Sequence, residues 1–283
     1  MHRFTLHRVR DTDRCMTALS LAIIGFTILS TSFVSGLFGM AGGMILVGVL
    51  LAYFDVATAM VAFSIIQFVA NGWRAVLWWR FVLWRIFLVY ALGAVLSFAV
   101  MRYVAIVPSK AAVYLGLGLL PFLIELLPAK ARPNIEWRGV PFVTGVLTTI
   151  IQLLTGVGGL FLDIFFQKSV LDRKTTIATK AVTQTFSHVV RAVYFSSFAG
   201  VADALPWWTY GPAIALSIAG TSLAAMVLER MTDVGFRQWT RRVIFSVSAI
   251  YLVRGLMLVG VIYWLAHMMR AIHSTSATAS VRS

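Results

Sequence analysis

The stretch Thr155-Gly156-Val157-Gly158-Gly159 interrupts a hydrophobic run that is otherwise suited to the interior of a membrane. Glycine has no Cβ, so it readily releases backbone N–H and C=O groups from the helical ladder. At membrane depth such groups are tolerated only where protein or a water-filled cavity receives them. The stretch therefore predicts a helix break at 156–159, inside the membrane and beside a cavity.

A polar stripe follows this break, on a helix expected from Asp172 to Phe198. Its members recur at helical spacing and share one helix face: Lys180, Gln184, His188 and Arg191. Basic side chains at membrane depth are costly unless they face a cavity or a partner, so the stripe predicts a functional site. Lys180 and Arg191 are about 16 Å apart along a helix, so we expect at most one of them near the midplane.

The first part of the chain repeats this pattern. Ser35-Gly36-Leu37-Phe38-Gly39-Met40-Ala41-Gly42-Gly43 breaks the first apolar run. Asp55, Gln67, Asn71 and Arg74 each precede Asp172, Gln184, His188 and Arg191 by 117 residues. For Arg74, a position at the membrane interface stays open as an alternative to a position in the site. The spacing indicates an internal repeat, and paired Gly-interrupted segments in two halves are typical of a transporter's central site.

The composition predicts the fold class. With 60% hydrophobic and 12% charged residues, the chain cannot cover a soluble protein with a charged shell. We expect an all-α polytopic membrane protein with about eight transmembrane helices in two four-helix repeats, each with a Gly-broken first helix. The net charge of +14 resides at segment ends and in short loops, which favours membrane topology over nucleic-acid binding.

We expect five regions along the chain. They are a basic cytoplasmic N-terminus (1–15), a first membrane repeat (16–128), a polar linker (129–138), a second membrane repeat (139–268) and a disordered tail (269–283). Equivalent loops of the halves carry opposite charge biases, which inverted repeats produce. Inversion needs an odd number of crossings per half, so a re-entrant hairpin in place of one broken unit stays an open alternative.

Chemistry other than transport has little support. One cysteine and no pair of histidines at ligand spacing predict no cofactor and no metal site. Motifs of common enzymes are absent, so we do not expect an enzyme. An intramembrane enzyme or lipid-handling protein would need a nucleophile–base pair, but Ser187 and His188 are adjacent and point apart on a helix. Asp163 is an isolated acid that suits either a cation or proton site or a structural role.

The glycine clusters and the repeat layout resemble the sulfite exporter TauE/SafE family, from about Ser20 to Leu265. The resemblance implies a secondary carrier in the inner (cytoplasmic) membrane that moves a small anion, such as sulfite or an organosulfonate. Partners would be the anion, membrane lipids and a coupling proton or sodium ion; an anion channel would use the same residues without coupling. The expected substrate-binding residues are Gly39, Gly42, Gly43, Gln67, Asn71, Arg74, Gly156, Gly158, Gly159, Lys180, Gln184, His188 and Arg191.

Overall fold

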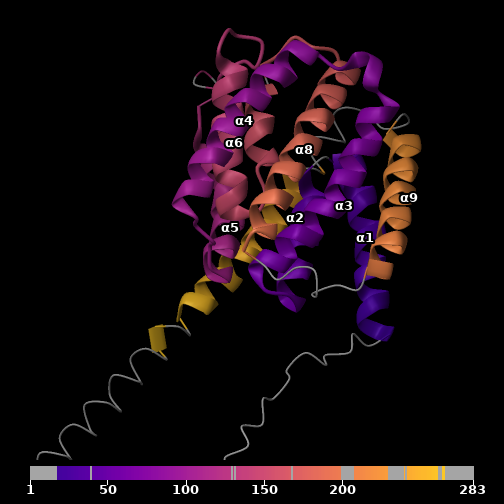
Figure 1. Ribbon diagram of the computed structural model, residues 1–283, viewed down its shortest axis with the longest axis vertical. Helices are drawn as coiled ribbons and strands as arrows, with labels where there is room; N and C mark the ends of the chain where they lie inside the picture. Colours follow the sequence, from indigo (N-terminus) through magenta and orange to yellow (C-terminus); the bar gives the residue numbers. More distant parts are fainter. Residues whose placement is uncertain are drawn as a thin grey trace, which may run out of the picture.

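The computed structural model describes residues 18–38, 40–128, 130, 132–166, 168–198, 207–228, 239, 241–260 and 263–264. In this part of the chain the regular structure is helical and contains no strand (Figure 1). Four of its helices are long and apolar enough to cross a membrane, and shorter apolar helices accompany them. The prediction of an all-α polytopic membrane protein is confirmed. The expected N-terminal region 1–15 and tail 269–283 lie outside the described residues.

The first half contains a broken helical unit followed by three further helices. The elements are α1 (Ala18–Phe38), α2 (Met40–Tyr53), α3 (Val56–Leu77), the short 3-10 helix η1 (Trp79–Phe81), α4 (Trp84–Val104) and α5 (Lys110–Leu126). Helix α1 ends at Phe38 and α2 begins at Met40, so the two helices are separated within the predicted glycine cluster.

The second half repeats this order. Its elements are α6 (Val140–Thr155), α7 (Gly159–Phe166), α8 (Arg173–Ser196), the 3-10 helix η4 (Trp207–Thr209), α9 (Tyr210–Leu228) and a last helix, Arg241–Gly260. The break between α6 and α7 coincides with the predicted break at 156–159.

Each broken unit folds back on itself as a helical hairpin. In the first half, Gly42 near the start of α2 packs so closely on α1 that a Cβ there would overlap the backbone oxygen of Thr31 and the backbone nitrogen of Ser35. In the second half, Ile135 N, before α6, donates to Phe165 O, near the end of α7, at 2.9 Å. The expected count of about eight spans assumed one crossing per broken unit and is not confirmed; both units fold back, as the alternative of a re-entrant hairpin describes for one of them. Apart from its hairpin, each half has three helices that each run once through the bundle. An odd number of crossings per half is what inversion requires.

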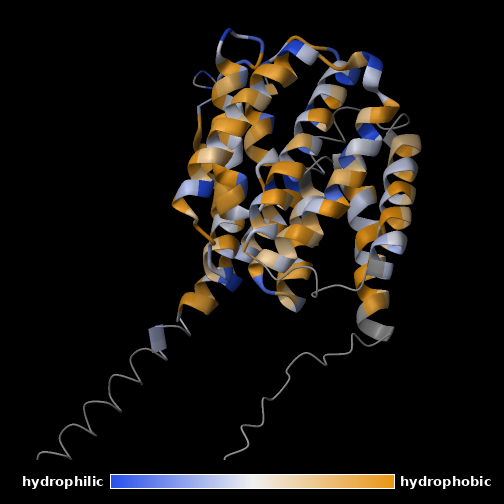
Figure 2. Ribbon diagram, viewed as in Figure 1, coloured by the Kyte–Doolittle hydropathy of each residue, from blue (hydrophilic) through white to orange (hydrophobic). Residues whose placement is uncertain are grey.

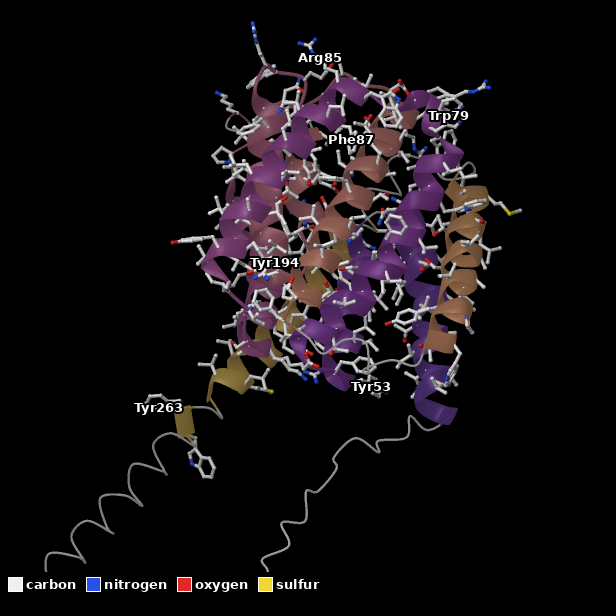
Figure 3. All side chains as sticks on the ribbon, viewed as in Figure 1. Tyr53, Trp79, Arg85, Phe87, Tyr194 and Tyr263 are labelled. Atoms are coloured by element: carbon white, nitrogen blue, oxygen red, sulfur yellow. The ribbon has the colours of Figure 1, made fainter. Side chains whose placement is uncertain are left out.

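The halves are therefore inverted relative to each other, as contacts at the two ends of α8 show. Near its start, Thr179 Oγ1 accepts from Leu83 N just before α4, at 3.0 Å. Near its end, Tyr194 OH donates to Ile106 O just after α4, at 2.7 Å. Thus α8 runs parallel to α4 and antiparallel to its own counterpart α3. In Figure 3, Tyr53 lies at one end of the bundle and Arg85 at the other.

The helices α3 and α8 begin in the same way, at opposite ends of the bundle. Asp55 caps α3 by accepting from Thr58 N at 3.0 Å and Thr58 Oγ1 at 2.6 Å. Asp172 caps α8 by accepting from Thr175 N and Thr175 Oγ1 at the same two distances. Such N-caps satisfy backbone N–H groups that the first turn leaves without partners. The shared cap sets the same register for both polar stripes.

The core of the bundle is formed around α3, while the outer helices present apolar side chains outward. Of its most apolar 18-residue window, α3 buries 72%, whereas α4 buries 33%. Large hydrophobic residues on α4 are exposed, among them Leu92 and Val100. Hydrophobic residues run along most helices in Figure 2, and hydrophilic ones gather at the loops. An apolar exterior around a partly polar centre is the arrangement that lipid requires.

Candidate functional site

The two polar stripes meet where α3 and α8 cross inside the bundle. Asn71 Nδ2 lies 3.2 Å from His188 Nε2, and both side chains are buried. The two residues are 117 positions apart and so occupy equivalent places in the two repeats. A contact between equivalent places lies on the axis that relates the halves, so this pair marks the centre of the site.

Arg191 lies one helical turn from His188 and is fully buried, with 0% of its surface exposed. Its Nε donates to Ser64 Oγ at 2.8 Å, and its Nη1 donates to Gly156 O. Its Nη2 lies 2.6 Å from His188 Nδ1, and its guanidinium lies 4.2 Å from the centre of the Phe63 ring. None of these partners carries a negative charge. The ion pairs recorded among the described residues do not include Arg191, so its charge is buried without a carboxylate beside it.

The helix break supplies one of these partners. Gly156 follows the last residue of α6 with φ at +84°, a left-handed conformation that side chains with a Cβ rarely adopt. Its N–H donates to Gln152 O at 2.9 Å, which ends the helix, while its carbonyl is left to accept from Arg191. The glycine break predicted from the sequence thus provides a backbone carbonyl that the helix does not use and that accepts from Arg191.

A narrow cavity of about 10 Å³, room for about one water molecule, lies beside Arg191. Its lining comes from α3, α6, α7, α8 and the break: Phe63, Thr148, Gln152, Gly156, Val157, Gly158, Gly159, Leu162, Gln184, Ser187, His188 and Arg191. A larger cavity between the end of α5 and the start of α6 is mostly apolar, and its charged lining residue, Arg138, is exposed. The narrow cavity is therefore the better candidate site.

Of the expected site residues, six line this cavity: Gly156, Gly158, Gly159, Gln184, His188 and Arg191. Asn71 contacts the cavity residue His188. Gln67 is buried on the same stripe, one turn before Asn71, and its carbonyl accepts from Asn71 Nδ2 at 2.9 Å.

Arg74 and Lys180 lie apart from this cavity. Arg74 Nη2 donates to Ser35 O near the end of α1, at 2.9 Å, so it turns into the protein rather than to the interface. Lys180 Nζ forms an ion pair with Asp163 Oδ1 of α7, at 2.5 Å. The Asp163 carboxylate also attracts the Arg74 guanidinium. Lys180, Asp163 and Arg74 therefore lie close to one another.

The first glycine cluster lies on the α3 side of the bundle. Gly43 faces Gln67, because a Cβ at Gly43 would come within 2.6 Å of Gln67 Nε2. Gly42 packs on α1 and serves the close approach within the hairpin. Gly39 lies outside the described residues.

The structure adds site residues that the sequence analysis does not select. Ser64 accepts from Arg191, and Phe63 lies under the guanidinium. Gln152 Nε2 donates to Ser187 O at 3.1 Å. Helical spacing could have indicated two of them, since Ser64 precedes Gln67 by three positions and Gln152 precedes Gly156 by four. Nothing in the sequence distinguishes Phe63 from the other aromatic residues of the core.

The fold and this centre define a class of protein. Two inverted helical repeats, each with a hairpin that ends inside the bundle, enclose a polar and cationic centre away from water; membrane carriers for small solutes are built this way.

Residues 22–254 match the family described as sulfite exporter TauE/SafE. Because the match covers most of the chain, the protein belongs to this family, whose members are membrane transporters of sulfite or related anions. No curated protein and no solved structure matches the chain.

Proposed function

We propose that this protein is a secondary transporter that carries a small anion, such as sulfite or an organosulfonate, across the inner (cytoplasmic) membrane by alternating access. The observation that supports this most strongly is the buried charge of Arg191, whose partners carry no negative charge. A buried cation is stable when it is paired. A substrate anion bound beside Arg191, in a conformation that widens the narrow cavity, would provide the missing charge.

The hydrogen-bonding capacity of the site also favours an anion. A guanidinium has five N–H donors, of which three have the partners described above. Asn71 and His188 add further N–H groups next to it. A sulfonate or sulfite oxygen accepts several such donors at once, and arginine holds planar pairs of oxygens in a bidentate way.

The inverted hairpins support alternating access. The α1–α2 hairpin starts from the end of the bundle where Tyr53 lies, and the α6–α7 hairpin starts from the opposite end. The second hairpin contacts Arg191 through Gly156 O, whereas Arg74 of the first half contacts Ser35 O. Movement of one half against the other would change which hairpin closes over the site and so expose the site to each side in turn.

An anion channel is the main alternative, because it would use the same residues without coupling. Flux into proteoliposomes separates the two. A carrier accumulates thiosulfate or sulfoacetate against its gradient when a proton or sodium gradient is imposed, whereas a channel only equilibrates it.

Variants of Arg191 test the site itself. Lysine keeps the charge but loses the planar fork, so we expect Arg191→Lys to weaken anion binding by about tenfold or more. We expect Arg191→Gln, which loses the charge, to abolish transport. Binding is measured by calorimetry on purified protein and transport in proteoliposomes, with sulfite, sulfoacetate, taurine and thiosulfate as probes.

Arg241→Gln is the matched control, because Arg241 pairs with Glu125 at an exposed position, 2.8 Å apart. We expect this variant to behave like the unmodified protein. Normal transport by a well-folded Arg191→Gln variant would remove Arg191 from the site.

A further inference from the structure

The imidazole of His188 lies between two nitrogen donors. On one side Arg191 Nη2 is 2.6 Å from Nδ1, and on the other Asn71 Nδ2 is 3.2 Å from Nε2. Arginine can only donate hydrogen bonds. The Asn71 amide also donates to Gln67 O at 2.9 Å and has a second N–H to direct at the ring.

While the Asn71 amide directs its nitrogen at the ring, neither tautomer of a neutral imidazole satisfies both neighbours, because the neutral ring has one N–H and one acceptor nitrogen. Whichever ring nitrogen carries the proton faces another donor. A buried donor without an acceptor is unfavourable. Rotation of the Asn71 amide lets the neutral ring donate from Nε2 to Asn71 Oδ1 and accept from Arg191 at Nδ1. An anion placed between His188 and Arg191 then leaves Nδ1 facing an acceptor, which favours a proton on that nitrogen as well.

We propose that His188 takes up a proton when an anion binds beside Arg191, so that the protein carries the anion and a proton together. In the loaded site, His188 Nδ1–H and the Arg191 guanidinium donate to the anion. The Nε2–H of the same ring donates to Asn71 Oδ1 after the amide has turned. This inference rests on the proposed anion site and identifies the proton as its coupling ion.

Electrostatics links anion binding to the protonation of His188. The charged group in contact with His188 is Arg191, and a second positive charge next to it is unfavourable while the site is empty. The bound anion offsets that repulsion. Binding free energies are reciprocal, so an anion that favours protonation is itself bound more tightly by the protonated site.

Other titratable groups near His188 are engaged elsewhere. On α4, the Tyr90 hydroxyl lies 2.7 Å from Ser187 Oγ. On α3, Arg74 donates to Ser35 O. Lys180 of α8 pairs with Asp163 of α7, and the cavity residues contributed by α6 are Thr148 and Gln152, neither of which titrates.

Proton uptake on binding tests the inference. The full-length protein, purified in detergent in weakly buffered solution near pH 7 with a pH indicator, is titrated with thiosulfate and separately with sulfoacetate. Both probes are fully ionised near neutral pH, so a proton taken up belongs to the protein. We expect about one proton per bound anion and an affinity that rises as the pH falls, by at most about tenfold per pH unit.

The two proposals fail differently in this experiment. Absence of binding of both probes contradicts the proposed anion site. Binding of either probe without proton uptake, and with an affinity independent of pH, overturns the role of His188 and leaves the anion site standing.

Two variants sharpen the result. His188→Gln keeps polar atoms but cannot titrate, so we expect weaker binding with no proton uptake. In Asn71→Asp a carboxylate faces Nε2 and holds the proton before the anion arrives, so we expect less uptake than in the unmodified protein. Glu125→Gln, at the exposed pair with Arg241, is the control and should leave uptake at about one proton.

Persistence of full uptake in His188→Gln would assign the proton to another group and overturn the inference. If that variant does not fold, Asn71→Asp decides: uptake equal to that of the unmodified protein contradicts the role of His188.

Discussion

At the scale of single residues, Arg191 and Arg74 occupy equivalent places in the two repeats but have different surroundings. Arg191 faces the hydroxyl of Ser64, which accepts from its Nε. The residue equivalent to Ser64 in the second repeat is Ala181, 117 positions later, so Arg74 has no matching hydroxyl there. Arg74 donates instead to Ser35 O, and its Nε has no hydrogen-bond partner among the described residues.

A second difference concerns the charge next to each arginine. Phe63 lies under Arg191, and the position equivalent to Phe63 is Lys180. A lysine near Arg74 needs a counter-charge, and Asp163 provides it by pairing with Lys180 at 2.5 Å. Asp163 therefore holds two neighbouring cations in place.

We predict that Asp163→Asn lowers the thermal stability of the protein without added anion and enlarges its stabilisation by thiosulfate. The reason is that Lys180 and Arg74 then lack a carboxylate, which an external anion can replace. Because the pair is partly exposed, we expect an initial loss of only about 1 kcal/mol. Thermal unfolding with and without thiosulfate measures both effects.

Glu125→Gln is again the control for Asp163→Asn, since it removes the acid of an exposed ion pair. Equal stabilisation by thiosulfate in Asp163→Asn and the unmodified protein would show that the Lys180 region does not attract anions.

At the scale of elements, the two stripe helices are set by identical caps. The Thr175 hydroxyl and backbone N–H hold the pKa of the Asp172 carboxyl below its usual range. At Asp55, partial burial acts in the opposite direction, but the hydrogen bonds from Thr58 outweigh it and the pKa is again lowered. Both carboxyl groups therefore favour the folded state in their ionised form.

We predict that the cap at Asp172 makes stability depend on pH. A lowered pKa means that the contribution is present at neutral pH and is lost as the pH falls through the pKa of the Asp172 carboxyl in the folded protein. Asparagine caps a helix but does not titrate. Compared with Asp172→Asn, the unmodified protein should unfold at a higher temperature at pH 7 and progressively lose that advantage as the pH falls below the usual pKa of an aspartate carboxyl.

Thermal midpoints recorded for both proteins across this pH range check the prediction, and Asp55→Asn is the matched variant at the other end of the bundle. A constant difference between the unmodified protein and Asp172→Asn from pH 7 to pH 3 would contradict it.

At the scale of the whole molecule, the hairpins bring most basic loops to one end of the bundle. The end that contains Arg85 in Figure 3 also carries Arg80, Lys130, Arg132, Arg138, Lys168, Arg173, Lys174 and Arg241, by the course of the chain. At the Tyr53 end, the described loops and helix ends carry Arg102 and Lys110. If each broken unit is counted as one crossing, these loops fall on opposite sides of the membrane, and equivalent loops of the two halves then carry opposite charge biases.

We predict that the Arg85 end faces the cytoplasm, because positive loops are retained there. In a Cys15→Ser background, Lys168→Cys should react with an impermeant thiol reagent only from the cytoplasmic side. Lys110→Cys should react from the opposite side. Since α1 starts at the Tyr53 end, this orientation is the reverse of the expected cytoplasmic N-terminus, and reversed labelling would restore that expectation.

Much of this architecture could be read from the chain alone. Composition determines an all-helical membrane protein, because 60% hydrophobic residues leave no other stable environment. Spacing determines the two repeats and the stripe of Gln184, His188 and Arg191, because residues three and four apart share a helix face. Gly156 marks the break, because only glycine readily adopts its left-handed conformation.

The tertiary structure alone decided how these parts meet. A stripe indicates which residues share a face but not what opposes it, so the contact of Asn71 with His188 follows only from the crossing of α3 and α8. Whether a Gly-broken unit crosses the membrane or turns back depends on packing against its neighbours, which local sequence does not encode. That choice inverts the halves, gives Lys180 its partner Asp163, and leaves Arg191 buried among partners that carry no negative charge.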